Sequence, residues 1–261
     1  MLPQPKKRLG QNFLIDPNIL AKIVSGSGVQ PHDTVLEIGA GNGALTRRIA
    51  SVVRKKVFAC EIDRRLLPIL REAVQGAPHV TVIEGDVLRL DLASLIPEGE
   101  KIKVLGNIPY NLSTPLIEFI IAGRHRISEA YLTVQKEFAG RMSASSGTKA
   151  YGSLSCFVGY YAEAEILFAI GRQCFRPVPK VDSVFIRLRM REDFVLSPLE
   201  EERLFGVIRH AFQQRRKMLT NSLKGVVPQE TLERFFSRYR IDPRIRPERL
   251  SLQDFIELSI L

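Results

Sequence analysis

Near its start the chain reads Val35-Leu36-Glu37-Ile38-Gly39-Ala40-Gly41-Asn42-Gly43, a short apolar run that leads directly into three glycines. A helical pattern, Leu45–Val53, follows at once. The order strand, glycine-rich turn, helix predicts the first unit of an α/β domain, with a nucleotide-like ligand at the carboxyl edge of the sheet. Gly39 and Gly41 are expected to let the backbone approach that ligand closely, although such a turn alone fits a dinucleotide equally well.

The same rhythm of short strands and helices continues along the chain. The predicted strands are Thr34–Ile38, Val57–Glu61, Val80–Glu84, Ile102–Gly106 and Ala130–Gln135, and the further predicted helices are Leu66–Val74 and Leu116–Ile121. This alternation predicts a mostly parallel sheet with helices on both faces. A short helix from Asp16 to Ser25, which has a capping Asp and a Pro at its first position, is expected before the first strand.

The pattern changes in the second half of the chain. Leu154–Tyr161 and Ser183–Met190 are predicted as two further strands, an antiparallel pair that brings the sheet to seven. Strand signals then stop, and Ser197-Pro198 followed by three glutamates indicates a helix start. We therefore expect a Rossmann-like α/β domain over residues 1–192 and a small all-helical domain over residues 193–261.

Composition limits the classes of function. The chain has 261 residues and a net charge of +10. This charge indicates a polyanionic partner, either nucleic acid or an acidic membrane face. Residues 57–100 carry an excess of acidic side chains, which indicates a second partner of opposite charge. Three isolated cysteines and four histidines without ligand spacing predict neither a disulfide framework nor a metal site. No signal peptide or membrane span is expected, so we predict a reduced, cytoplasmic location.

Acidic residues at strand ends refine the choice of ligand. Glu61 ends the second strand, where a carboxylate can accept both hydroxyls of a ribose. Glu37 precedes the glycines and Asp86 follows the third strand, an arrangement that disfavours a pyrophosphate. S-Adenosyl-L-methionine carries an ammonium and a sulfonium and no phosphate, so these carboxylates favour it over a dinucleotide. For any single one of these carboxylates, the alternative interpretation is a structural role as a capping residue of an α/β domain.

The segment Asn107-Ile108-Pro109-Tyr110 follows the fourth strand at the same edge. An exocyclic adenine amino group is a poor nucleophile, because its lone pair is delocalised into the ring. Asn107 Oδ1 and the Ile108 carbonyl would accept the two amino hydrogens, Pro109 would fix the turn and Tyr110 would stack on the base. An ordinary strand-ending turn is the alternative interpretation.

Taken together, these motifs resemble the rRNA adenine N6,N6-dimethyltransferase family of the KsgA type, from about Lys7 to Leu258. Further motifs support the resemblance: Gly10-Gln11-Asn12-Phe13-Leu14, Tyr151-Gly152-Ser153-Leu154-Ser155, Phe175-Arg176-Pro177-Val178-Pro179-Lys180-Val181-Asp182-Ser183 and Arg215-Arg216-Lys217-Met218-Leu219. The resemblance implies a seven-stranded methyltransferase domain. It also implies a cofactor pocket lined by Asn12, Leu14, Gly39, Glu61, Asp86 and Asn107. The implied products are two adjacent dimethyladenosines in a hairpin near the 3′ end of small-subunit rRNA.

Substrate recognition is expected outside this pocket. Phe175 lies in a proline-bearing loop and could stack on a flipped base, with an ordinary connector as the alternative. Arg215, Arg216 and Lys217 are predicted to contact phosphates, with a solvated helix end as the alternative. We expect a monomer that acts on the assembling small ribosomal subunit. Two other functions stay open: a large-subunit rRNA dimethyltransferase of the antibiotic-resistance type and a non-catalytic RNA-binding assembly factor.

Overall fold

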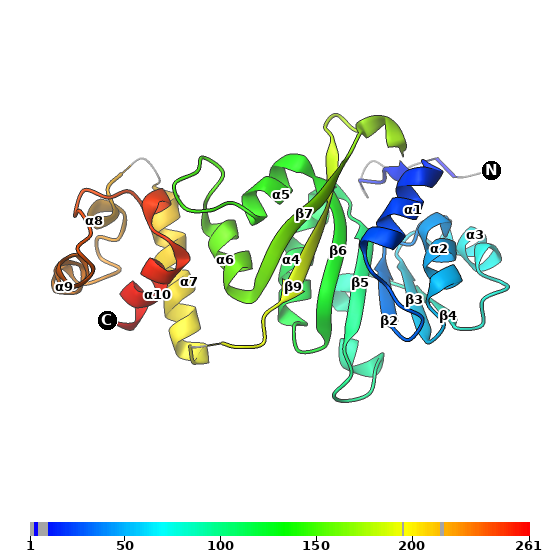
Figure 1. Cartoon of the computed structure of the whole chain (residues 1–261), viewed down its shortest axis with the longest axis horizontal. Helices are drawn as coiled ribbons and strands as arrows, with labels where there is room; N and C mark the ends of the chain where they lie inside the picture. The colour runs from blue at the N-terminus through cyan, green and yellow to red at the C-terminus, as the bar shows by residue number, and fades with distance from the viewer. Residues whose placement is uncertain (1–2, 5–9, 195, 215–216) are drawn as a thin grey trace. The chain divides into compact units, whose positions relative to one another are not determined.

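The computed structural model of the chain describes residues 3–4, 10–194, 196–214 and 217–261 (Figure 1). Its strands are β1 (Phe13–Leu14), β2 (Thr34–Ile38), β3 (Lys56–Glu61), β4 (Val80–Glu84), β5 (Ile102–Asn107), β6 (Ile127–Gln135), β7 (Ala162–Ile170), β8 (Phe175–Arg176) and β9 (Ser183–Met190). Its α-helices are α1 (Pro17–Gly26), α2 (Ala44–Val52), α3 (Leu67–Ala73), α4 (Ser113–Ala122), α5 (Lys136–Met142), α6 (Ser153–Tyr161), α7 (Pro198–Gln213), α8 (Leu219–Ser222), α9 (Gln229–Tyr239) and α10 (Leu252–Ile260). Short 3₁₀ turns include η2 (Val87–Arg89), η4 (Tyr110–Leu112) and η5 (Arg172–Cys174).

Seven strands form the main sheet, in the order β4-β3-β2-β5-β6-β9-β7. The strands from β4 to β6 are parallel to their neighbours, and β9 runs antiparallel to β6. The predicted Rossmann-like α/β class is confirmed. In a parallel sheet all carboxyl ends lie at one edge, and this edge brings the ends of β2, β3 and β5 together.

The central strands are buried because helices cover the sheet. All five residues of β2 are buried, as expected for a central parallel strand. A large apolar cluster joins α1 and α2 to this sheet through residues such as Ile23, Ile49 and Phe185. Asp16 caps α1 by accepting hydrogen bonds from the N–H groups of Asn18 and Ile19, which confirms the predicted helix start.

One predicted strand is wrong. Residues 154–161 lie in helix α6, and the strand at this place in the chain is β7. The run is mostly apolar, and such a run cannot be assigned to a strand or a buried helix by its period. Ser155 Oγ accepts a hydrogen bond from the N–H of Gly152 and donates one to the carbonyl of Arg141, which stabilises the first turn of the helix.

The chain divides into two compact units. The first comprises Met1–Ala139 and Ala164–Met190, and the second comprises Gly140–Glu163 and Arg191–Leu261. The sequence placed a boundary at residue 192 and assigned everything before it to the first domain, whereas α6 belongs to the second unit. There α7 begins with a capping box in which Glu200 Oε2 accepts from both the N–H and the hydroxyl of Ser197. Within the described residues, no helix has the length and apolarity needed to cross a bilayer.

Candidate active site at the carboxyl edge of the sheet

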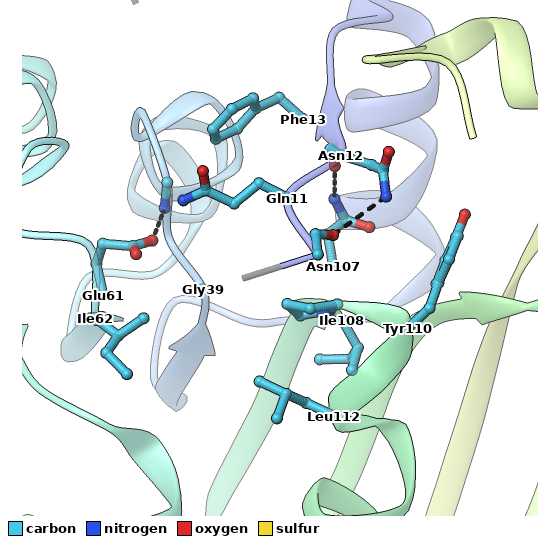
Figure 2. A pocket seen from close by; sticks show the side chains of 13 residues that line it. Gln11, Asn12, Phe13, Gly39, Glu61, Ile62, Asn107, Ile108, Tyr110 and Leu112 are labelled. Atoms are coloured by element: carbon cyan, nitrogen blue, oxygen red, sulfur yellow. Dashed lines mark hydrogen bonds between the residues drawn. The ribbon is translucent and has the colours of Figure 1, made fainter. Parts of the chain in front are cut away.

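A pocket opens where β2, β3 and β5 end (Figure 2). Three segments supply its walls: the glycine loop after β2, the end of β3, and the end of β5 with the turn that follows. A fourth segment, Gly10–Phe13, lies across it, and we call this the covering segment. The lining residues are Gly10, Gln11, Asn12, Phe13, Gly39, Gly41, Glu61, Ile62, Asn107, Ile108, Pro109, Tyr110 and Leu112.

The glycine loop requires its glycines for two separate reasons. Gly41 has a φ of +59°, and a side chain there would also approach the Phe13 ring to 3.4 Å. Gly43 has a φ of +79°, and its added Cβ would lie 2.8 Å from the Cβ of Ala73. Any other residue at position 43 would therefore strain the backbone and displace α3. The loop presents bare backbone to the pocket, as a closely bound ligand needs.

Glu61 is 5% exposed, and backbone donors hold both of its carboxylate oxygens. Oε2 accepts a hydrogen bond from the N–H of Gly41 at 2.7 Å, and Oε1 accepts one from the N–H of Asp63 at 2.7 Å. Burial raises the pKa of Glu61, and the two backbone donors oppose this shift. Each oxygen keeps a second lone pair, so this fixed carboxylate can still accept hydrogen bonds from a ligand.

The Asn107 side chain is held in one orientation. Its Nδ2 donates to the backbone carbonyl of Asn12 at 2.7 Å, and Asn12 Nδ2 donates to the carbonyl of Gly10 at 3.2 Å (Figure 2). With its nitrogen engaged, the Asn107 amide presents Oδ1 as an acceptor. The N–H of Ile108 donates to the carbonyl of Thr133 at 3.0 Å, which fixes the next peptide group.

Tyr110 forms the outer end of this wall. Its hydroxyl lies 2.9 Å from Ser183 Oγ, at the start of β9. Burial raises the pKa of Tyr110, so its phenol stays neutral at physiological pH. The ring is therefore anchored at its hydroxyl end, while its faces remain available for stacking.

Two residues outside the motifs, Asp63 and Arg65, also hold the pocket together. The buried carboxylate of Asp63 accepts hydrogen bonds from Gln11 Nε2 at 3.1 Å and from the guanidinium of Arg65. Arg65 Nη1 also donates to the carbonyl of Gln4 at 3.1 Å. Asp63 thus connects the floor of the pocket, through its N–H to Glu61, with the covering segment above. In the sequence, this role is indicated only by position: Gln11 is adjacent to Asn12, and Asp63 lies two residues after Glu61.

The pocket is small in this arrangement. Its volume is about 100 Å³, less than the roughly 300–1,000 Å³ of ligand pockets. Gln11 and Phe13 extend from the covering segment toward the glycine loop (Figure 2). The space between the covering segment and the glycine loop is therefore smaller than a nucleoside-sized ligand occupies.

Comparison with known proteins decides the family. The family model described as ribosomal RNA adenine dimethylase matches residues 3–261, which is almost the entire chain. The chain belongs to the ribosomal RNA adenine dimethylase family. The resemblance seen in the motifs is thereby confirmed, and the protein is an enzyme of the methyltransferase class.

Relatives and solved structures agree with this assignment. The ribosomal RNA small subunit methyltransferase A of Geobacillus thermodenitrificans is 43% identical over 263 residues, 97% of this chain and 89% of that protein. The protein of the same name from Levilactobacillus brevis is 41% identical and covers 97% and 88%. A dimethyladenosine transferase from Plasmodium falciparum superposes with a TM-score of 0.78 at 28% identity, over 94% of this chain and 95% of that one. The 23S rRNA methyltransferase ErmE gives 0.75 at 29% identity, over 96% and 100%.

Two residues expected in the cofactor pocket of the dimethylase do not line it. Asp86 accepts a hydrogen bond from the N–H of Leu88 at 3.1 Å and so caps η2, beside the buried Cys60. Leu14 is 7% exposed and belongs to the apolar core. Its backbone nevertheless matters, because β1 pairs with β8 and so holds the end of the covering segment.

The expectation that Phe175 stacks on a flipped base needs correction. Its side chain is 1% exposed and packs in the same apolar cluster as Leu14. The two residues are also paired in the β1–β8 register. A ring in this position has no face free for a base. Among the expected phosphate contacts, Arg215 and Arg216 lie outside the described residues, and Lys217 is exposed in the second unit.

Glu37 has a different environment from the one expected. It is 2% exposed in the middle of β2 and does not line the pocket. Its Oε2 has no hydrogen-bond partner among the described residues. Burial raises the pKa of Glu37 to about 8, while Thr46 lowers it and the charge of Glu61 raises it to a smaller extent. The side chain is therefore mostly protonated at neutral pH.

Metal-binding geometry is also absent from the described part of the dimethylase, where no group of three or more His, Cys, Asp or Glu could hold an ion.

Proposed function

We propose that this dimethylase transfers methyl groups from S-adenosyl-L-methionine to the N6 amino groups of two adjacent adenosines. The target is a hairpin near the 3′ end of small-subunit rRNA, and the reaction takes place in the cytoplasm on assembling small subunits. The observation that carries the proposal is the fixed Asn107 amide, whose acceptor oxygen lies at the same pocket as Glu61 and the glycine loop.

The lining residues fit the proposed cofactor. Gly39 and Gly41 have φ values of +71° and +59°, which residues with a side chain rarely adopt, so bare backbone faces the pocket and suits the close approach of a ligand. Glu61 would accept the ribose hydroxyls through its remaining lone pairs. Ile62, 48% exposed at the pocket, offers an apolar surface to the adenine ring. When bound, the cofactor supplies an electrophilic methyl group.

The residues after β5 would prepare the adenosine. Asn107 Oδ1 and the carbonyl of Ile108 accept the two hydrogens of the amino group, which withdraws its lone pair from the ring and directs it at the methyl group. Tyr110 stacks on the base, and Pro109 keeps the turn rigid. No strong base is needed, because the methylated nitrogen is acidic enough to lose its proton to water.

Two other functions are less well supported. A large-subunit enzyme of the resistance type is the first, since ErmE shares the fold at 29% identity. The small-subunit choice rests on the relatives at 41 and 43% identity, whose names specify that subunit.

A non-catalytic assembly factor is the second alternative function. Intact Asn107 and Glu61, with their hydrogen bonds in place, favour activity over it.

The test uses separated, unmethylated small and large ribosomal subunits with labelled cofactor. We expect label in the small subunit and primer-extension stops at two adjacent adenines. Label in large-subunit rRNA alone would replace this function with the resistance type. Tight binding to small subunits without any label would favour the assembly factor. Gel filtration of the enzyme alone tests the proposed monomer.

A further inference from the structure

A second hollow lies at the carboxyl edge of the sheet. Its volume is about 520 Å³, within the roughly 300–1,000 Å³ of known ligand pockets. The end of β6, the start of α5 and the segment from η5 to β9 form its walls. The lining residues are Gln135, Lys136, Glu137, Arg172, Lys180, Val181 and Asp182, none of which lines the active-site pocket.

The hollow is next to the residues that would hold the target base. Asn107 pairs in register with Thr133 on β6, and Gln135 lies two residues further, roughly 7 Å along the strand. Gln135 in turn pairs with Ser183, which holds the Tyr110 hydroxyl. The two sites are therefore neighbours on one sheet edge, with the Tyr110–Ser183 contact between them.

Three cations surround the hollow. The side chains of Lys136, Arg172 and Lys180 are exposed. None of the three forms an ion pair with a carboxylate of the described residues. Unpaired cations at a concave surface are what a phosphate group needs for binding.

The walls are fixed before any ligand arrives. Asp182 accepts hydrogen bonds from the backbone of two of the cationic residues. Its carbonyl oxygen accepts from the N–H of Lys136 at 3.1 Å, and its Oδ1 accepts from the N–H of Arg172 at 3.0 Å. The Arg172 guanidinium also reaches the Lys180 carbonyl at 3.5 Å. The Asp182 carboxylate is thus engaged with the backbone. A hollow that is already ordered loses little conformational entropy on binding.

We propose that this hollow binds the backbone phosphate of the nucleotide that flanks the target adenosine. The inference rests on the proposed function, because a flipped adenosine must be followed by a phosphodiester within one nucleotide of its pocket. Lys136, Arg172 and Lys180 neutralise that phosphate and fix the strand relative to Asn107. Such contacts position the RNA without reading its sequence.

The test compares two triple variants with the same change of charge. In the first, Lys136, Arg172 and Lys180 are replaced by Gln. In the matched control, Arg47, Arg48 and Arg71 on α2 and α3 are replaced by Gln, and these also form no ion pair with a carboxylate of the described residues. The measurements are binding to unmethylated small subunits over a range of salt concentrations, steady-state methylation, and calorimetry with S-adenosylhomocysteine.

For the first triple variant we expect a KM for small subunits raised at least tenfold, and a kcat within about twofold of the parent. The slope of log affinity against log salt should fall by about 0.7–0.9, because the three cations together neutralise one phosphate and each neutralised phosphate contributes roughly that amount. Binding of S-adenosylhomocysteine should not change. The control variant should keep the parental slope and KM.

A parental slope and KM in the first variant would overturn the inference, and so would equal losses in both variants. If the triple variant unfolds at a lower temperature than the parent, Lys180→Gln alone replaces it, with an expected fall in slope that is measurable but smaller than the roughly 0.7–0.9 of a whole phosphate. Absence of methylation by the parent would overturn the proposed function together with this inference. A normal parent with an unaffected variant would overturn this inference alone.

Discussion

The side-chain nitrogen of Asn107 donates a hydrogen bond to the backbone carbonyl of Asn12 at 2.7 Å, across 95 residues of sequence. This contact fixes which end of the Asn107 amide faces the pocket. It also holds the covering segment over that pocket. The residue proposed to accept the adenine amino group therefore takes part in closing the site.

Asn107→Ala should lower kcat by about two to three orders of magnitude, the usual loss when a positioned polar group is removed from a transition state. Affinity for S-adenosylhomocysteine should fall less than about tenfold, since only one neutral hydrogen bond to the covering segment is removed. Single-turnover methylation and calorimetry measure the two effects. Asn18→Ala, on the exposed surface of α1, serves as the control. A normal methylation rate in Asn107→Ala would exclude the assigned role.

Glu61→Ala should weaken S-adenosylhomocysteine binding by about 2–4 kcal/mol, because it removes two charge-assisted hydrogen bonds to the ribose. Its partner in the β3–β4 register is Glu84, which is exposed and forms an ion pair with Arg64. Glu84→Ala is therefore the matched control and should bind normally. Calorimetry measures the affinity of both variants for S-adenosylhomocysteine. Unchanged binding by Glu61→Ala would rule out the ribose contact.

Glu37 should make stability depend on pH. Its pKa of about 8 lies above the value of 4.5 for an exposed carboxyl, so the folded state holds a proton that the unfolded state releases. Relative to Glu37→Gln, the contribution of Glu37 to the free energy of unfolding has its full value below pH 4.5. It declines as pH rises, by at most about 1.4 kcal/mol per unit, and levels off above pH 8. Urea unfolding of both proteins from pH 5 to 9 measures this difference, and a constant difference would contradict the prediction.

Phe175→Ala should lower the free energy of unfolding by about 3–5 kcal/mol, as expected for a large aromatic side chain removed from a core. Val178→Ala, three residues away at a side chain that is 52% exposed, should cost little. Denaturant unfolding tests both variants. A Phe175→Ala protein of parental stability and weak RNA affinity would restore the stacking role that the structure removes.

Neutralising Arg215, Arg216 and Lys217 together should weaken binding to small subunits. The salt slope should fall by about 0.7–0.9 for every phosphate that these cations neutralise in the parent protein. Because these residues belong to the second unit, calorimetry with S-adenosylhomocysteine should give the parental affinity. A parental salt slope would assign the three cations to a solvated helix end.

The sequence predicted most of the sheet, because each central parallel strand is a short, mostly apolar run between turn residues. β2, β4 and β9 begin and end where expected. The error at 154–161 arose where helix and strand are both buried and apolar, so that neither period was visible. The position of Glu61 and Asn107 at strand ends was enough to predict that they share a pocket.

Other parts of the site depend on contacts that no local pattern reveals. Gln11 reaches Asp63 across 52 residues, and the motif around Phe175 does not show which way the ring points. The second hollow likewise forms only when the end of β6 meets the segment before β9. Sequence patterns show which residues sit at an edge, but long-range packing decides which side chains face a ligand there.

The covering segment also has a consequence for protein synthesis. Residues 10–14 are translated long before their partners Asn107 and β8. The strand pair β1–β8 needs residue 176, so about two thirds of the chain must be translated before the segment can settle. Until then Phe13 lacks its strand partner on β8, and the neighbouring Leu14 lacks part of its core. The covering segment thus settles late although it is translated early, and the pocket is completed only after about two thirds of the chain has been made.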